Sequence, residues 1–211
     1  MRPTSLYAVA LVALLGVFGF WLTGAWRGDG LRDGNAALQA PSIGGPFTLA
    51  ATDGSTVTGE TYRGKIMLVY FGYTFFYFGY TFCPDACPTT LNDIAGALAE
   101  LGPLADRIEP LFITVDPKRD TREVLANYVR AFDPRIVGLT GTPEQITAAA
   151  KAYGVYYAAY KIADAPDGYL MDHTSVVFVM NEAHRFVASF TQDTPAAQIA
   201  DRLRKLIAKP S

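Results

Sequence analysis

The sequence predicts an α/β fold, in which a mixed sheet is flanked by helices and preceded by one transmembrane helix. Strand-like and helix-like segments alternate along residues 66–208, a pattern typical of a sheet that is covered by helices. The runs IMLVYF (residues 66–71) and LFITVDP (residues 111–117) indicate buried strands, and the first is apolar on both faces. Residues 3–26 carry no charged side chain and supply the membrane helix.

The N-terminal segment, residues 1–27, is expected to be a retained signal anchor. Its uncharged stretch is long enough to cross about 30 Å of hydrocarbon as a helix, and Trp21 and Trp26 lie near its outer end. A cleaved signal peptide ending near Ala25 is the alternative. Residues 28–43 lack apolar periodicity and are expected to form a flexible tether, which leaves residues 44–211 as the folded domain.

Length and charge exclude some classes of function. The chain has 211 residues and a formal net charge of -2, and its Lys and Arg residues are scattered along the sequence. One anchor and one domain of ordinary size fit this length. No basic cluster indicates binding to nucleic acid.

The elements of the domain follow from local patterns. A Thr52-Asp53-Gly54 turn predicts an opening β-hairpin. Further strands are expected over residues 66–71, 111–117, 136–139, 155–161, 175–180 and 185–190, with an irregular excursion over residues 162–171. Helices are expected over residues 89–101, 121–132, 143–153 and 195–208, with N-caps at Thr89 or Thr90, at Asp120 or Thr121, and at Thr142.

Cys83 and Cys87 are the two cysteines of the chain, and they stand where a strand passes into a helix. A helix N-terminus favours thiolate, which is both a nucleophile and a ligand for soft metals. Three residues separate the pair, one more than in a thioredoxin-type Cys-x-x-Cys site, and this spacing favours a metal clamp. A redox dithiol and a structural disulfide are the alternatives.

Two histidines complete the set of candidate ligands. His173 stands in YLMDHTSVVFVM, at the start of an expected strand, where a surface residue is the alternative to a ligand. His184 lies in an expected tight turn and is interpreted as solvated. Asp172 is a candidate for orienting His173, with a strand-edge acid as the alternative. Asp116 is expected either to face the site or the partner, or to cap the next loop.

Four motifs carry a resemblance to a known family. YFGYTFCPDACPTTL, VDPKRDT, GLTGTPEQI and YLMDHT, in this order, resemble the SCO/SenC family of membrane-tethered copper proteins over residues 47–206. The resemblance implies a thioredoxin-like fold and a copper site made by Cys83, Cys87 and His173. Two thiolates and one imidazole suit Cu(I) and can hold Cu(II), whereas zinc normally takes a fourth ligand.

The resemblance also implies a function. It implies a metallochaperone that delivers copper to the dinuclear copper site in subunit II of cytochrome c oxidase, or to a similar copper-accepting membrane protein. The alternatives are a membrane-anchored thiol-disulfide oxidoreductase, with Cys83 and Cys87 as its disulfide pair, and a copper or redox sensor. The expected location is the inner (cytoplasmic) membrane, with the domain in the periplasm or an equivalent intermembrane space.

A tandem repeat precedes the cysteines. Residues 70–76 read YFGYTFF and residues 77–83 read YFGYTFC, whereas the family pattern that the chain resembles has one copy. A strand that slipped by seven residues would swap its faces, because side chains alternate along a strand. We therefore expect residues 66–71 to keep the strand, residues 80–82 to keep the approach to Cys83, and the surplus to loop out around residues 72–79.

Overall fold

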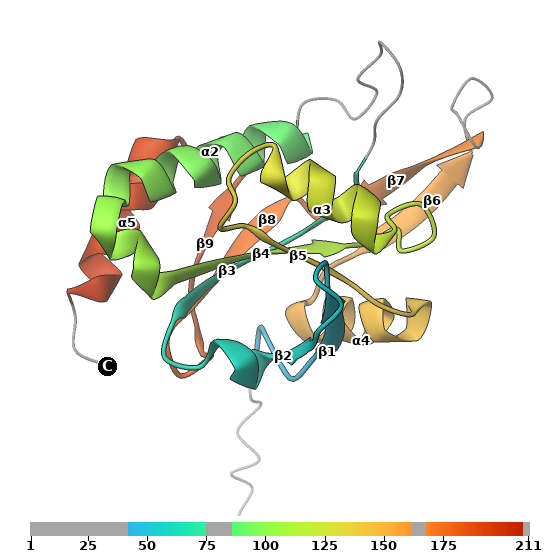
Figure 1. The fold of residues 1–211 in the computed structure, drawn as a ribbon, viewed down its shortest axis with the longest axis horizontal. Coiled ribbons are helices and arrows are strands. Elements are labelled where there is room, and N and C mark those ends of the chain that lie inside the picture. The colour runs from blue at the N-terminus through green and yellow to red at the C-terminus, as the bar shows by residue number, and fades with distance from the viewer. Residues whose placement is uncertain (1–41, 75–85, 162–167, 209–211) are drawn as a thin grey trace, which may run out of the picture. The chain divides into compact units, whose positions relative to one another are not determined.

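Strand β3 (Ile66–Gly72) lies near the middle of a seven-stranded sheet in the computed structural model, which describes residues 42–74, 86–161 and 168–208. The order of the strands is β2-β1-β5-β4-β3-β8-β9, and a separate two-stranded ribbon is formed by β6 and β7 (Figure 1). Strands β3, β4 and β5 are parallel, and the other pairs in the sheet are antiparallel. The predicted mixed α/β sheet is confirmed.

The elements have the following bounds. The strands are β1 (Thr48–Ala51), β2 (Thr56–Thr58), β3 (Ile66–Gly72), β4 (Ile108–Thr114), β5 (Val137–Thr140), β6 (Tyr157–Lys161), β7 (Tyr169–His173), β8 (Val176–Met180) and β9 (Phe186–Thr191). The α-helices are α2 (Ala86–Leu101), α3 (Arg122–Arg130), α4 (Pro143–Tyr153) and α5 (Ala196–Ile207), and two 3-10 helices are η1 (Gly59–Tyr62) and η2 (Gly102–Arg107).

Helices cover both faces of the sheet. Helices α2, α3 and α5 lie on one face and α4 lies on the other (Figure 1). Each face has its own apolar core: one packs α2, α3 and α5 against the sheet, and the other packs α4 against the sheet, including its β1–β2 hairpin. Two-sided burial explains why β3 is apolar throughout, since both of its faces are removed from water.

All seven residues of β3 are buried. Leu68 and Tyr70 belong to the core under α2, whereas Val69 and Phe71 belong to the core over α4. Strand β3 therefore takes its last residues from the first copy of the repeat, as predicted. Gly72 lies on the same face of β3 as Tyr70. A Cβ atom at Gly72 would lie 2.8 Å from Phe112 and 3.1 Å from the sulfur of Cys87.

Helix α2 begins earlier than predicted. It starts at Ala86, so Thr89 and Thr90 lie inside it and the prediction that one of them caps it is wrong. Pro88 explains how the helix can start before the threonines. A proline in the first turn costs no hydrogen bond, because the amide there has no partner within the helix.

The ribbon strand β7 was missed by the sequence patterns. Residues 169–171 were expected to belong to an irregular excursion, but β7 pairs with β6 from Tyr169↔Lys161 to His173↔Tyr157. The reason is that a short strand beside Gly168 carries little local signal, and the pairing with β6 decides its conformation. Residues 162–167 lie outside the described residues.

The other helices and strands agree with the sequence to within a few residues. Thr121 caps α3 with its side chain, and Thr142 caps α4 in a capping box with Gln145. Strand β4 begins before the predicted Leu111 and includes Pro110. Strand β5 first pairs at Leu111, so Pro110 lies where only β3 flanks β4, and a strand tolerates proline there.

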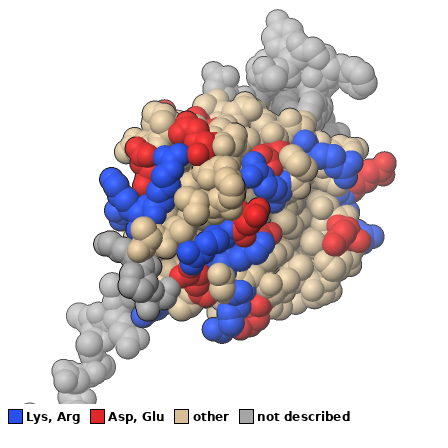
Figure 2. Space-filling view, turned by 60° about the vertical axis from the view of Figure 1, so that its left-hand side comes forward, with Lys and Arg blue, Asp and Glu red and all other residues tan. Residues whose placement is uncertain are grey.

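The predicted membrane anchor and most of the predicted tether lie outside the described residues, which belong to the compact unit Ser42–Ser211. Within these residues, no helix is long and apolar enough to cross a bilayer. On the face shown in Figure 2, acidic and basic side chains are interspersed instead of gathering by sign. Surface ion pairs such as Lys65–Glu109 are part of this mixed surface.

A buried acid fixes the end of β3. Asp120, fully buried, accepts hydrogen bonds from the backbone N–H of Thr74 (2.9 Å), from the Thr74 hydroxyl and from the Thr114 hydroxyl (2.6 Å). Burial raises the pKa of Asp120 to about 6, although the three hydrogen bonds oppose this shift. The predicted alternative, that Asp120 caps α3, is wrong, because its carboxylate is used by Thr74 and Thr114.

The first prediction concerns the pH dependence of stability. Because the pKa of Asp120 is higher in the folded than in the unfolded chain, its contribution is fully present below pH 3.8 and is lost as the pH rises through about 6. Relative to Asp120→Asn, the wild type should therefore gain about 1 kcal/mol in free energy of unfolding between about pH 7.5 and about pH 5. Urea denaturation at both pH values measures this difference, and parallel changes in the two proteins would contradict it.

The second prediction concerns the repeat. Deleting residues 76–82 leaves one YFGYTF before Cys83 and does not touch the paired residues of β3. The free energy of unfolding should change by less than about 1 kcal/mol, because loop closure depends only weakly on loop length. Urea denaturation of the deleted and full-length chains provides the comparison. A loss of several kcal/mol would show that the second copy is part of the packed core.

Candidate metal site

Cys87 lies in the first turn of α2, beneath the end of β3. Its side chain is fully buried and lies against Gly72, where a larger residue would crowd the sulfur. The N-terminus of a helix carries partial positive charge, which stabilises a thiolate at this position. Cys83, the other predicted cysteine ligand, lies outside the described residues.

His173 is the last residue of β7, and its ring contacts the side chain of Cys87. Its Nε2 atom lies 3.3 Å from Sγ of Cys87, across a separation of 86 residues. Its Nδ1 atom lies 3.2 Å from the carbonyl oxygen of Thr174. Since a carbonyl can only accept, Nδ1 carries the proton in the neutral ring, and the lone pair of Nε2 faces the sulfur.

The imidazole of His173 is held in its neutral form. Burial lowers its pKa below the ordinary value of 6.5, although the Thr174 carbonyl and the charge of Asp172 act in the other direction. A neutral imidazole is the form that binds a metal. Asp172 is exposed and alternates with His173 on the ribbon, so the backbone of Thr174, not Asp172, sets the orientation of the ring.

Aromatic side chains from the first copy of the repeat line the site. The Tyr73 ring meets the His173 ring edge to face, with centroids 5.8 Å apart, and the Tyr70 ring does so at 6.3 Å. The Tyr70 hydroxyl donates to Sγ of Cys87 at 3.5 Å. Both tyrosines are almost fully buried, so the site has an apolar wall on the side of β3.

The loop after β4 joins the two halves of the site. The Arg119 guanidinium donates to the carboxylate of Asp116 and to the carbonyl oxygen of Tyr169 (3.1 Å), at the start of β7. It also stacks on the Tyr169 ring, 4.0 Å from the centroid, and lies 5.7 Å from the centroid of Tyr73. The Tyr169 hydroxyl donates to Asp116 at 3.1 Å. Asp116 is thus buried in a structural network next to the site.

Sequence reasoning found two described residues that meet in the structure, and it missed others that support them. Cys87 and His173 come together. Tyr70, Tyr73 and Arg119 were not singled out. Arg119 belongs to the VDPKRDT motif, so the sequence could have identified it. The contacts of Tyr70 and Tyr73 with Cys87 and His173 depend on the fold and have no local signal.

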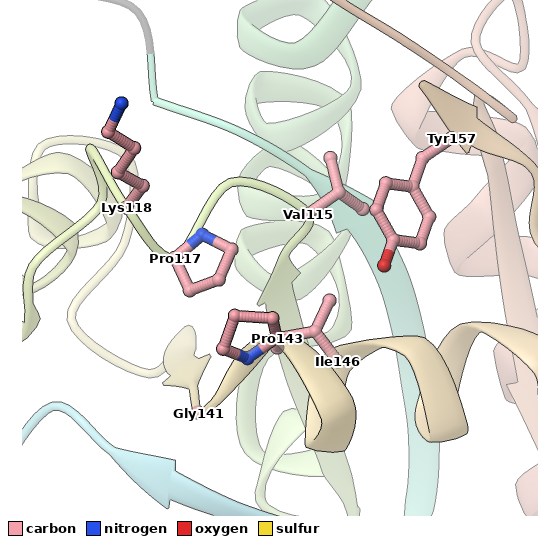
Figure 3. Close-up of a pocket in the computed structure, with 7 residues that line it drawn as sticks. All are labelled: Val115, Pro117, Lys118, Gly141, Pro143, Ile146 and Tyr157. Atoms are coloured by element: carbon pink, nitrogen blue, oxygen red, sulfur yellow. The ribbon is translucent and has the colours of Figure 1, made fainter. Parts of the chain in front are cut away.

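A groove is lined by residues from the loop after β4, from the start of α4 and from the ribbon strand β6 (Figure 3). It has a volume of about 290 Å³ and is lined by Val115, Pro117, Lys118, Gly141, Pro143, Ile146 and Tyr157. Tyr157 is the cross-strand partner of His173, so this apolar groove is continuous with the ribbon that bears the candidate ligand. It contains no thiol or imidazole. Among the residues that the structure describes, no group of three or more His, Cys, Asp or Glu side chains could hold a metal ion.

Known proteins resemble this chain in sequence. The SCO1/SenC family model matches residues 35–76 and 74–208 in two segments, and the break falls within the tandem repeat. A mitochondrial SCO1 homologue of Mus musculus is 40% identical over 166 residues, which cover 78% of this chain and 56% of the relative. SenC of Rhodobacter capsulatus is 39% identical over 170 residues, covering 81% and 72% of the two chains. The chain spans about half the length of the mammalian and plant SCO1 homologues that it matches.

Solved structures support the same assignment. ScoI of Arabidopsis thaliana, solved with copper bound, has a TM-score of 0.70 and 36% identity, and the match covers 79% of this chain and 98% of that one. Copper-bound ScoI of Bradyrhizobium japonicum has a TM-score of 0.69 and 38% identity, with coverage of 78% and 99%. The thioredoxin-like fold implied by the sequence motifs is therefore confirmed. By sequence and by fold, the chain belongs to the SCO1/SenC family.

Proposed function

We propose that this protein is a copper-binding metallochaperone for the assembly of cytochrome c oxidase. Its ligands would be Cys83, Cys87 and His173, and its target would be the dinuclear copper site of oxidase subunit II. The observation that carries the proposal is the 3.3 Å approach of His173 Nε2 to Cys87 Sγ, between residues far apart in sequence. Copper-bound structures of two relatives support the choice of metal.

The donor atoms suit copper in both of its common oxidation states. Thiolate and imidazole are soft and intermediate donors, a set that binds Cu(I) in a three-coordinate site and can also hold Cu(II). The neutral His173 ring offers Nε2 without a proton having to leave first. Cys83 precedes Cys87 by four positions, close enough in the chain for both sulfurs to contact one ion.

The position of the protein in the cell is part of the proposal. Residues 1–27 would anchor it in the inner (cytoplasmic) membrane, and the domain of residues 44–211 would lie in the periplasm or an equivalent intermembrane space. The apolar stretch of residues 3–26 supports this arrangement. An anchored carrier would meet its acceptor, also a membrane protein, by diffusion in one plane.

The third prediction tests the ligand set. His173→Ala should abolish stable copper binding in an anaerobic titration, while Cys83 and Cys87 still form a disulfide on oxidation. His184→Asn is the matched control, because His184 is the other histidine of the chain and lies in the β8–β9 turn with a positive φ of 58°, which asparagine tolerates. It should keep the wild-type copper stoichiometry. Unchanged stoichiometry in His173→Ala would refute the proposed site.

The fourth prediction separates a copper carrier from a thiol reductase. Copper-loaded protein is mixed with a copper-free fragment of oxidase subunit II whose cysteines are already reduced. A carrier should transfer copper to this fragment, detected as the absorption of the dinuclear site, whereas a reductase has nothing to reduce. Failure of transfer to the reduced fragment, together with reduction of the oxidised fragment, would favour the thiol-disulfide oxidoreductase.

A further inference from the structure

Tyr70 stands closer to the candidate ligands than its place in the sequence suggests. A chain with one YFGYTF has its first tyrosine six residues before the first motif cysteine, and Tyr77 holds that place here. In the structure, however, Tyr70 of the first copy is in β3, opposite Phe112 and Val177, and its hydroxyl donates to Cys87. The tyrosine that contacts Cys87 is therefore not the one that stands six residues before Cys83 in the sequence.

The contact with Cys87 is a buried one. The Tyr70 side chain is 1% exposed and Cys87 is 0% exposed. A buried tyrosine hydroxyl usually has a hydrogen-bond partner, and a cysteine sulfur accepts such a bond, more strongly as a thiolate than as a thiol. The Tyr70 ring also packs on Phe112, with centroids 5.9 Å apart, and on His173, so it has little freedom to turn its hydroxyl away.

Gly72 provides independent support for this use of the first copy. A Cβ atom at Gly72 would lie 3.1 Å from Sγ of Cys87, closer than ordinary van der Waals contact. The glycine of the first copy therefore makes room for the sulfur to which Tyr70 donates. Both residues lie on the α2 face of β3, as the alternation of a strand requires.

We infer that Tyr70 is a positioning residue that tunes Cys87 by donating a hydrogen bond to its sulfur. A hydrogen bond to a thiolate withdraws charge from the sulfur and weakens its donation to a bound metal. It also stabilises the reduced sulfur relative to the disulfide. For copper the inference rests on the proposed function; for the dithiol it does not.

The fifth prediction uses Tyr70→Phe, which removes the hydroxyl and retains the ring, with Tyr77→Phe as the matched control in the second copy. Copper-free full-length chain in mild detergent is equilibrated with glutathione buffers, where two thiols and one oxidised glutathione give the Cys83–Cys87 disulfide and two reduced glutathiones. Tyr70→Phe should raise the equilibrium constant for disulfide formation about five-fold, the factor expected for one net hydrogen bond. This change lowers the reduction potential by about 20 mV. Tyr77→Phe should match the wild type.

Copper provides the second measurement on the same proteins. With the hydroxyl removed, the sulfur-to-Cu(II) charge-transfer band should move to longer wavelength, and the ratio of Cu(II) to Cu(I) affinity should rise about five-fold. A merely structural role of Tyr70 would change stability without this spectral shift. Thermal unfolding of each variant shows whether the fold is retained.

The outcomes separate the two proposals. If the wild type takes up no copper, the proposed function fails, while the dithiol equilibrium still tests the hydrogen bond. If copper binds and Tyr70→Phe matches the wild type in both measurements, the inference is overturned and the proposed function stands. A shift in Tyr77→Phe instead of Tyr70→Phe would also overturn it, since it would assign the donor to the second copy.

Discussion

The burial of β3 on both faces is the constraint on which the site depends. β3 is held between the parallel strand β4 and the antiparallel strand β8, so its register is fixed from two sides. Alternation then sends Tyr70 and Gly72 toward α2, where they meet Cys87. A shift of the strand by seven residues would exchange its faces and place polar and aromatic side chains in the apolar core. The sheet therefore accepts the duplication only beyond the end of β3.

The loop between β4 and α3 connects the end of β3 to the start of β7 through side-chain hydrogen bonds. Asp120 binds Thr74, where the chain leaves β3 toward the cysteines, and Arg119 binds Tyr169, where β7 begins. One short loop thereby holds both the strand that precedes the cysteine segment and the ribbon that bears His173. Because the ribbon is not hydrogen-bonded into the main sheet, such side-chain contacts, together with core packing, determine where the histidine lies.

The two described ligand candidates lie on elements that differ in how extensively they are packed. Cys87 is part of a long helix that packs against α5 and the sheet, and it is fully buried. His173 is at the end of a two-stranded ribbon and is only partly buried. A fully buried sulfur and a more accessible imidazole form a combination that suits a carrier, because the metal must be held and then passed on. The ribbon also contributes Tyr157, the cross-strand partner of His173, to the lining of the apolar groove (Figure 3).

The sequence by itself determined the class of the fold, the central strands, the capped helices α3 and α4, and the chemical identity of the candidate ligands. These features have local causes: apolar runs, capping side chains and a chain with just two cysteines and two histidines. Only the tertiary structure decided that Cys87 and His173 meet, that β7 forms a ribbon with β6, and that the Tyr70 hydroxyl faces the sulfur of Cys87. The reason is that strand pairing and burial act between residues distant in sequence, and no local pattern states which of these residues become neighbours.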